Sequence, residues 1–347
     1  MHVGHSTSTG LYSRSGSGSK ASARALSCVR VQFRRGADLL VRHAEVALDD
    51  AEFAEPSTLA LWGGPVPGEE KLLCEDEDSD GDPRPRVVSL RRAIVADLAI
   101  AGADLRACRF EGALGLDQLR IEVDCEFAEA PPHWHYARRR TLAEEHVWRA
   151  ARPWRWSWHS NWCPPECYLP EWLEGPDPPG GLKPGQIAAI YRSLRTALEN
   201  RKDEPGAADF YYGEMEMRRL TKPETDAKAD TGARLGNEMK GSGERLTLNL
   251  YWVVSGYGLR ASRALLALGL TVLVFAFLFD RWGFRPDQSL GRGLLFSVES
   301  TSSLFRVPET KDFALTAGGE VLQVFLRLLG PLFFGLALLS LRGRVKR

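Results

Sequence analysis

Two long hydrophobic runs near the C-terminus interrupt an otherwise mixed pattern of apolar and polar residues. Residues 264–279 read ALLALGLTVLVFAFLF and carry no charge, and residues 321–341 carry a single charge, Arg327. About 20 apolar residues in a helix cross a hydrocarbon core roughly 30 Å thick. We therefore predict two transmembrane helices, over residues 264–284 and 321–341.

The segment between these runs changes from apolar to rich in hydroxyl groups. Residues 289–308 read SLGRGLLFSVESTSSLFRVP, which predicts a short re-entrant helix. Residues 246–260 carry aromatic side chains just before a basic pair, which is typical of a membrane interface. Basic residues precede the first run and follow the second, so both chain ends are predicted to be cytoplasmic in a multi-pass protein of the cell membrane. A helical hairpin buried in a soluble protein is the alternative.

Two charged residues fall at the predicted membrane depth. Glu299 lies in the re-entrant segment and Arg327 lies in the second span. Because an unpaired charge is costly in hydrocarbon, we hypothesise that these two side chains form an ion pair.

A five-residue rhythm of apolar positions runs through the N-terminal half. Small or apolar residues recur at every fifth position, and larger residues follow two places later. The small positions are Val31, Gly36, Val41, Val46 and Ala51, then Val88, Ala93, Leu98, Ala103, Cys108 and Ala113. The larger apolar positions in the second block are Leu90, Val95, Ile100, Leu105 and Phe110. A period of five fits neither a helix nor a strand and predicts a coil of short faces stacked on one another.

The segment ADLAIAGADLRACRFEGA resembles the A-(D/N)-L-x-x consensus of the pentapeptide-repeat family. That resemblance implies a right-handed quadrilateral β-helix, a solenoid whose core is buried only between neighbouring coils. An ordinary α/β segment with aligned alanines is the alternative. Residues 115–127 alternate like a closing strand and are expected to cap the last coil. Some upstream coils are expected to be missing.

The predicted fold is mixed, with a short β-helix, a helix hairpin and a two-span membrane hairpin. Amphipathic spacing predicts the helix hairpin over residues 185–200 and 207–220. The predicted regions are a disordered arm (1–28), a degenerate repeat region (29–130) with an acidic insertion (54–86), a Trp-rich segment and helix hairpin (131–220), a linker (221–245) and a membrane domain (246–347).

Composition and local motifs limit the partners and metals that the chain is expected to bind. The 347 residues carry a net charge of zero, which gives no reason to expect nucleic acid as a partner. The six cysteines are scattered and expected to be reduced. His133, His135, Cys163 and Cys167 offer four possible zinc ligands, but zinc-binding cysteines usually come as C-x₂-C pairs and nothing in the sequence brings these two pairs together. The alternative is an aromatic layer packed on the coils, with the histidines at its edge. Asp76, Asp78, Asp80 and Gly81 imitate the start of a calcium loop, but Val87 stands where the bidentate glutamate belongs. No metal or cofactor is predicted.

No catalytic motif is present in the sequence. Glu144, Glu145 and His146 are adjacent, but consecutive helical residues point to different faces and make a poor acid–base pair. No catalytic residue is assigned, and the chain is not expected to be an enzyme.

The last ninety residues resemble the two-helix pore domain of potassium-type channels. Where such channels carry a glycine-containing filter, this chain reads Ser302-Ser303-Leu304-Phe305-Arg306. Without glycine the carbonyl ladder cannot form in the same way, and Arg306 would repel cations.

The order of regions from Val29 onward resembles actinobacterial pentapeptide-repeat membrane proteins. It implies a non-catalytic, membrane-tethered interaction or sensory module, with the bilayer, an unknown protein and further copies of the chain as partners. An oligomeric channel-like protein with a degenerate filter is the alternative.

Overall fold

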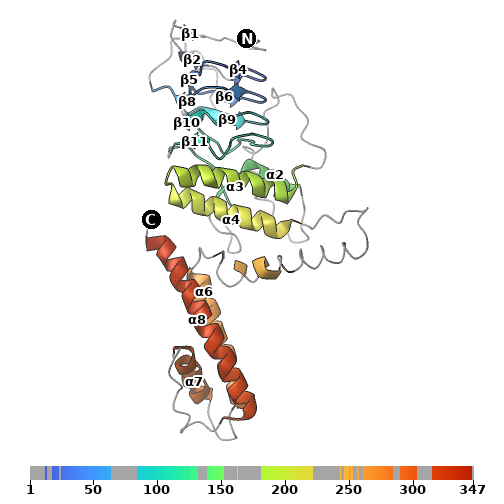
Figure 1. Cartoon of the computed structure of the whole chain (residues 1–347), viewed down its shortest axis with the longest axis vertical. Coiled ribbons are helices and arrows are strands. Elements are labelled where there is room, and N and C mark those ends of the chain that lie inside the picture. The colour runs from blue at the N-terminus through green and yellow to red at the C-terminus, as the bar shows by residue number, and fades with distance from the viewer. Residues whose placement is uncertain are drawn as a thin grey trace, which may run out of the picture. The chain divides into compact units, whose positions relative to one another are not determined.

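The chain forms two compact units, Met1–Thr221 and Lys222–Arg347. The structure is a computed structural model (Figure 1), and it describes residues 12–13, 18–22, 25–63, 84–122, 124–131, 139–151, 162, 181–221, 243, 246–249, 251–252, 256–257, 261–283, 290–302 and 315–345. The first unit mixes short strands with helices, and the described part of the second is almost entirely helical. The division after Thr221 falls where the linker is predicted to begin.

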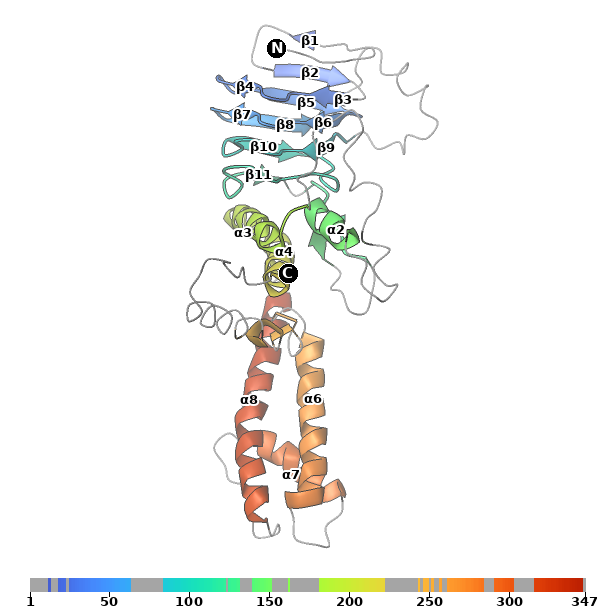
Figure 2. The ribbon, with the colours of Figure 1, turned by 90° about the vertical axis from the view of Figure 1, so that its right-hand side faces the viewer.

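Short strands, most of them paired in parallel, form the N-terminal part of the first unit. One sheet has the order β1-β2-β5-β8-β10-β11, a second β3-β6-β9, and a third β4-β7. Figure 2 shows the strands of the first sheet, from β2 to β11, stacked one below another. The strands are β1 Tyr12–Ser13, β2 Gly18–Ser22, β3 Ala25–Ser27, β4 Gln32–Phe33, β5 Asp38–Arg42, β6 Glu45–Ala47, β7 Glu52–Phe53, β8 Ser57–Leu61, β9 Arg86–Ser89, β10 Leu98–Ala101, β11 Arg120–Ile121, β12 Ala128–Glu129 and β13 Arg140–Thr141.

The register of these pairs repeats every twenty residues. Gly18 pairs with Asp38, Ala25 with Glu45, and Gln32 with Glu52, each across twenty positions. Twenty is four times the five-residue rhythm of the sequence. The offset grows to forty-one where Thr58 pairs with Ala99, because the chain inserts extra residues between β8 and β9. Isolated bridges such as Ser89 with Arg109 and Ile94 with Leu114 return to twenty.

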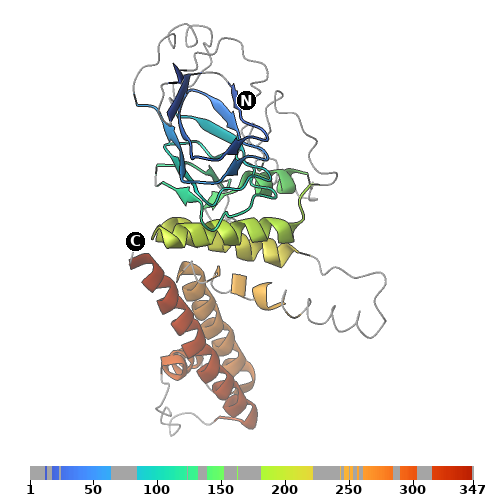
Figure 3. The same ribbon diagram turned by 45° about the horizontal axis from the view of Figure 1, so that its top comes forward.

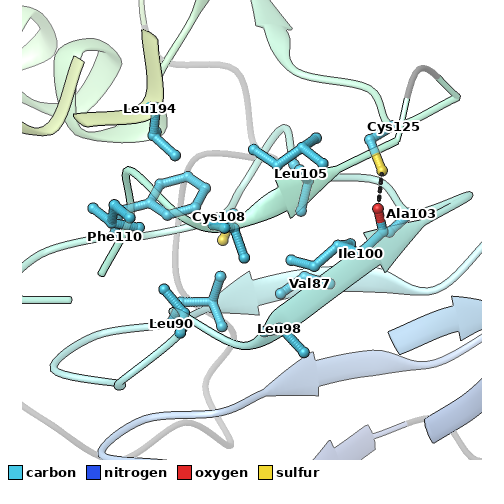
Figure 4. Packing of buried hydrophobic residues seen from close by; sticks show 14 of the residues in the cluster. Val87, Leu90, Leu98, Ile100, Ala103, Leu105, Cys108, Phe110, Cys125 and Leu194 are labelled. Atoms are coloured by element: carbon cyan, nitrogen blue, oxygen red, sulfur yellow. Dashed lines mark hydrogen bonds between the residues drawn. The ribbon is translucent and has the colours of Figure 1, made fainter. Parts of the chain in front are cut away.

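Both series of apolar positions in the second block point into the core. The larger residues from Leu90 to Phe110 are at most 1% exposed, and so are the small residues from Val88 to Cys108. Figure 4 shows Leu90, Ile100, Leu105 and Phe110 packed in one cluster. Burying each large side chain contributes about 1.5–3 kcal/mol, so this stack accounts for much of the stability of the unit.

Three predicted boundaries differ from the structure. β2 and β3 lie inside the arm predicted to be disordered over residues 1–28, and they pair with β5 and β6. β8 lies inside the predicted insertion 54–86, yet it pairs with both β5 and β10. The predicted closing strand supplies β11, which pairs with β10 in parallel and so extends the sheet.

Helices cover the end of the stack that follows β11. They are α2 Ala143–Ala150, α3 Pro184–Asn200 and α4 Glu204–Leu220. Figure 3 shows α3 lying across this end, and Figure 4 shows Leu194 of α3 directed at Phe110. α3 and α4 pack side by side as the predicted hairpin, with Pro184 in the first turn of α3 and Asp203 capping α4 through the Gly206 amide, 3.1 Å away.

The second unit has two long helices with a short helix between them in sequence. α6 covers Ala261–Leu278 and continues as a π-helical turn, η2, over Phe279–Gly283. α7 covers Leu290–Ser302, and α8 covers Ala317–Val345 with Pro331 inside it. Both predicted spans and the predicted re-entrant helix therefore form helices, and residues 303–308 of the re-entrant segment lie outside the described residues.

Candidate functional site

The long helices of the second unit expose large apolar side chains. Residues 265–283 and 317–336 are long and apolar enough to cross a membrane, and only 11% and 22% of those windows are buried. Leu266 of α6 is 71% exposed and Leu328 of α8 is 67% exposed. A core helix of a soluble protein would be mostly buried. These surfaces therefore suit an apolar surrounding better than water.

A small aromatic core joins α6, α7 and α8. Phe279 at the end of the first helix, Phe296 of α7 and Leu326 of α8 are fully buried together. The rings of Phe279 and Phe296 meet edge to face, with centroids 5.1 Å apart. α7 also contacts both long helices. The short helix is thus packed against the hairpin.

Two glycines of α8 allow close contact with the other helices. A Cβ atom on Gly319 would lie 2.3 Å from the Gly283 carbonyl oxygen, and one on Gly330 would lie 2.6 Å from Cγ2 of Thr301. The Thr316 hydroxyl donates to the Trp282 carbonyl at 2.7 Å and accepts from the Gly319 amide at 3.1 Å. Small residues therefore set the approach of α8 to η2 and α7.

Polar groups are also buried between these helices. Ser297 and Ser300 of α7 and Gln323 of α8 are at most 8% exposed. Among the described residues, their Oγ and Nε2 atoms have no hydrogen-bond partner. Buried polar groups at membrane depth are costly, so they often mark functional positions.

Two further membrane features are predicted, an ion pair between Glu299 and Arg327 and a filter-like segment after the short helix. Glu299 is exposed and Arg327 is half-buried. Their ion pair stays a prediction. α7 ends at Ser302, so the filter-like residues that follow lie outside the described part of the chain.

An aromatic and basic group precedes the first long helix. The Arg263 guanidinium lies over the Trp252 ring, 5.0 Å from its centroid, and its Nη1 donates to the Trp252 carbonyl at 3.4 Å. Tyr251 and Tyr257 meet edge to face. This arrangement has the composition of an interfacial belt.

In the first unit, a buried ionic cluster surrounds Glu145. Its carboxylate is fully buried and accepts from Arg139 Nη2 at 2.7 Å, from Arg149 Nε at 2.8 Å and from the Tyr191 hydroxyl at 2.6 Å. Burial would raise the pKa of Glu145, but Arg139, Arg149 and Tyr191 lower it to about 2. The cluster fastens α2 to α3, and Arg149 extends it to Glu216 of α4.

The residues beside Glu145 contact different groups, as their helical spacing predicts. Glu144 accepts a hydrogen bond from the Phe110 amide, and burial raises its pKa. The His146 ring lies between the Trp162 carbonyl and the Thr141 hydroxyl, and burial lowers its pKa. All three residues are at most 2% exposed. The arrangement can hold helices together, but it presents none of these groups to a substrate.

Sequence reasoning missed the partners of Glu145. Arg149 lies four residues after Glu145, a spacing typical of helical ion pairs, so this contact could have been found. Tyr191 comes from the distant helix α3, and Arg139 lies just before β13, outside the helix that carries Glu145, so no helical spacing indicates either residue.

The proposed metal ligands have no structural description. His133, His135, Cys163 and Cys167, and the aspartates of the calcium-like loop, lie outside the described residues. Within the part that is described, no group of three or more His, Cys, Asp or Glu side chains could hold a metal ion.

Comparison of the chain with family models, with curated proteins and with solved structures gave no match.

Proposed function

We propose that the chain is a non-catalytic membrane-tethered interaction or sensory module. The observation that carries this proposal is the exposed apolar surface of α6 and α8, which includes Leu266, Leu270 and Leu328. Leaving such surfaces in water would favour aggregation, whereas hydrocarbon covers them without cost. The lipid bilayer is therefore the first partner of this protein.

The first unit supplies the surface that the anchor displays. Two observations support a pentapeptide-repeat solenoid. Strands pair with strands twenty residues further along the chain, and the apolar positions that recur every five residues from Val88 to Phe110 are fully buried. A solenoid exposes the same side-chain positions coil after coil, which suits binding of another protein rather than catalysis. The buried charged residues around Glu145 hold α2, α3 and α4 together. We therefore expect a partner protein to bind the outer faces of the solenoid instead.

The distribution of charge supports a cell-membrane location with both chain ends in the cytoplasm. Arg260 and Arg263 precede the first span, and Arg342 and Arg344 follow the apolar part of the second. The hairpin also offers a surface through which copies of the chain can associate.

The test is extraction of the full chain from membranes at alkaline pH. We expect the protein to remain in the membrane pellet, as integral proteins do, and an epitope tag at either end to be protected from protease outside intact cells. Release of the protein into the soluble fraction would overturn the membrane assignment. Digestion of both tags would overturn the orientation while leaving the anchor intact.

An oligomeric channel-like protein with a degenerate filter is the second candidate. α7 packs against both long helices, and Ser297, Ser300 and Gln323 bury polar groups there. A polar path between helices would need such groups. Ion flux through liposomes that contain the purified chain distinguishes the candidates. Flux above that of empty liposomes supports a channel, and an oligomeric sample without flux supports the interaction module.

A further inference from the structure

We propose that the end of the membrane hairpin where α6 begins and α8 ends binds the headgroups of anionic phospholipids. This inference rests on the proposed membrane function, and it adds the chemical class of lipid that the hairpin prefers.

The two long helices run in opposite directions. Gly319, at the start of α8, lies against Gly283, at the end of the first helix. α6 and α8 contact each other, and Figure 2 shows them side by side. The start of α6 and the end of α8 therefore lie at the same end of the hairpin, and we call this the basic end.

The charges at the basic end all have one sign. The sequence contains no Asp or Glu from Leu246 to Phe279, nor from Val321 to Arg347. Arg263 lies in the first turn of α6, and Arg342 and Arg344 lie in the last turn of α8. The sequence adds further cations next to these helices, at Arg260, Lys346 and Arg347. The opposite end mixes both signs, with Asp280 and Arg281 in η2 and Glu320 in the first turn of α8. An anionic surface is thus complementary to one end only.

These cations fall at the depth of lipid headgroups. The uncharged run of the second span continues to Leu341, and α8 continues to Val345. At about 1.5 Å per residue, Arg342 and Arg344 lie within roughly 5 Å of the end of that run. This distance falls inside the headgroup region, which adds about 5–8 Å on each side of the hydrocarbon core.

On α6, Arg263 is also expected at the depth of the lipid headgroups. Its guanidinium stacks on Trp252, so the cation is held beside an aromatic ring of the kind that settles at the membrane interface. Arginine recognises phosphate oxygens through paired hydrogen bonds. In a zwitterionic lipid the choline or ethanolamine cation offsets that phosphate charge, whereas phosphatidylglycerol keeps a net negative charge. The basic end therefore selects the anionic headgroup.

Quenching of tryptophan fluorescence by brominated lipids tests this selection. Trp252 and Trp282 are the two tryptophans after residue 222, one in the segment before α6 and one at the opposite end of the hairpin. The full chain is reconstituted in vesicles with equal amounts of phosphatidylglycerol and phosphatidylcholine, either one brominated on its acyl chains. The signal of Trp252 is the difference between the parent and W252F, and that of Trp282 is obtained with W282F.

We expect phosphatidylglycerol to be enriched about fivefold over phosphatidylcholine beside Trp252, the effect of roughly one cation at an anionic surface. Trp282 should sense both lipids equally. The R342Q/R344Q variant should lose most of the enrichment, R342K/R344K should keep most of it, and R281Q at the other end should change nothing. Inorganic phosphate, compared with chloride at the same ionic strength, should not abolish the preference, since the site binds headgroups in a bilayer.

Equal quenching of Trp252 by both lipids would overturn the lipid preference while leaving the membrane anchor intact. The same conclusion would follow if R342Q/R344Q behaved like the parent, or if phosphate removed the enrichment. Absence of quenching by either lipid would instead overturn membrane insertion itself, and with it the proposed function.

Discussion

The two units of the chain differ in how far their large side chains are buried. In the first unit, Phe110, Tyr191 and Phe210 are fully buried, and even the charged side chains around Glu145 lie inside. In the second, Leu266, Leu270 and Leu328 are more than half exposed, and among the described residues a small buried apolar cluster joins Phe279, Phe296 and Leu326. Proteins in water rarely expose large contiguous apolar surfaces, so the exposed side chains of the second unit suit an apolar surrounding, as proposed above.

The units also differ in how their helices are joined. α2, α3 and α4 are held by buried ion pairs and hydrogen bonds around Glu145. α6, α7 and α8 meet through small residues such as Gly319 and Gly330. Without a hydrophobic driving force between helices, close packing of small residues is the expected way to associate them in lipid. Substitutions at matched positions test whether this contrast is real.

The largest effect is expected at the buried carboxylate of the first unit. Glu145→Ala leaves Arg139 and Arg149 buried without their partner, which should lower the free energy of unfolding by about 3–5 kcal/mol. Glu144→Gln is the matched control. It keeps an acceptor for the Phe110 amide and removes a charge that burial disfavours, so it should change stability by less than about 1 kcal/mol. Urea unfolding followed by tryptophan fluorescence measures both, and equal losses would refute the distinction.

The next prediction tests whether lipid surrounds the second unit while water surrounds the first. Leu270→Lys, at a position of α6 that is 63% exposed, should oppose membrane insertion by about 2.5–3.5 kcal/mol if lipid surrounds it. Leu114→Lys in the first unit, at a position 61% exposed, should cost less than about 0.5 kcal/mol. The measurement is the fraction of chain that resists alkaline extraction, with folding of the first unit checked separately. If Leu270→Lys inserted as well as the parent, α6 would not be a lipid-facing span.

The same contrast explains which features the sequence could predict. The five-residue rhythm revealed the buried positions from Leu90 to Phe110 because each layer places equivalent residues in equivalent surroundings. Hydropathy revealed α6 and α8 because both helices are long and apolar along most of their length. Both signals are local and repeated.

Features that depend on distant neighbours could not be predicted. Strand β2 reads GSKAS, and nothing in that composition favours a strand; hydrogen bonds from β5 supply its structure. The Glu145 cluster joins Tyr191 of α3 and, through Arg149, Glu216 of α4. A single sequence does not show that such residues meet, because their contact depends on the docking of α3 and α4.

A smaller effect is expected at the helix contacts of the second unit. Gly319→Ala would place Cβ 2.3 Å from the Gly283 carbonyl, so α8 must shift, at a cost of about 1–3 kcal/mol. Gly335→Ala, on the same helix with no atom within 4 Å, should be neutral or slightly stabilising because alanine favours the helix. Thermal unfolding of the reconstituted chain compares the two variants. A loss at Gly335 as large as that at Gly319 would contradict the close contact.

The smallest effect concerns protonation of His146 and should be confined to the first unit. Burial lowers the pKa of this ring below the ordinary 6.5, although Glu145 opposes the shift and Arg139 reinforces it. A lowered pKa means that the unfolded chain binds the proton more readily. The stabilisation is therefore complete above pH 6.5 and declines as the pH falls towards the folded-state pKa, by at most about 1.4 kcal/mol per pH unit for one proton. Urea unfolding at pH 7.5, 6.5 and 5.5 gives the slope, and His146→Gln should flatten it. The second unit contains no histidine, so its thermal unfolding should keep the same midpoint across this range. An unchanged slope in His146→Gln would show that another group carries the pH dependence of the first unit.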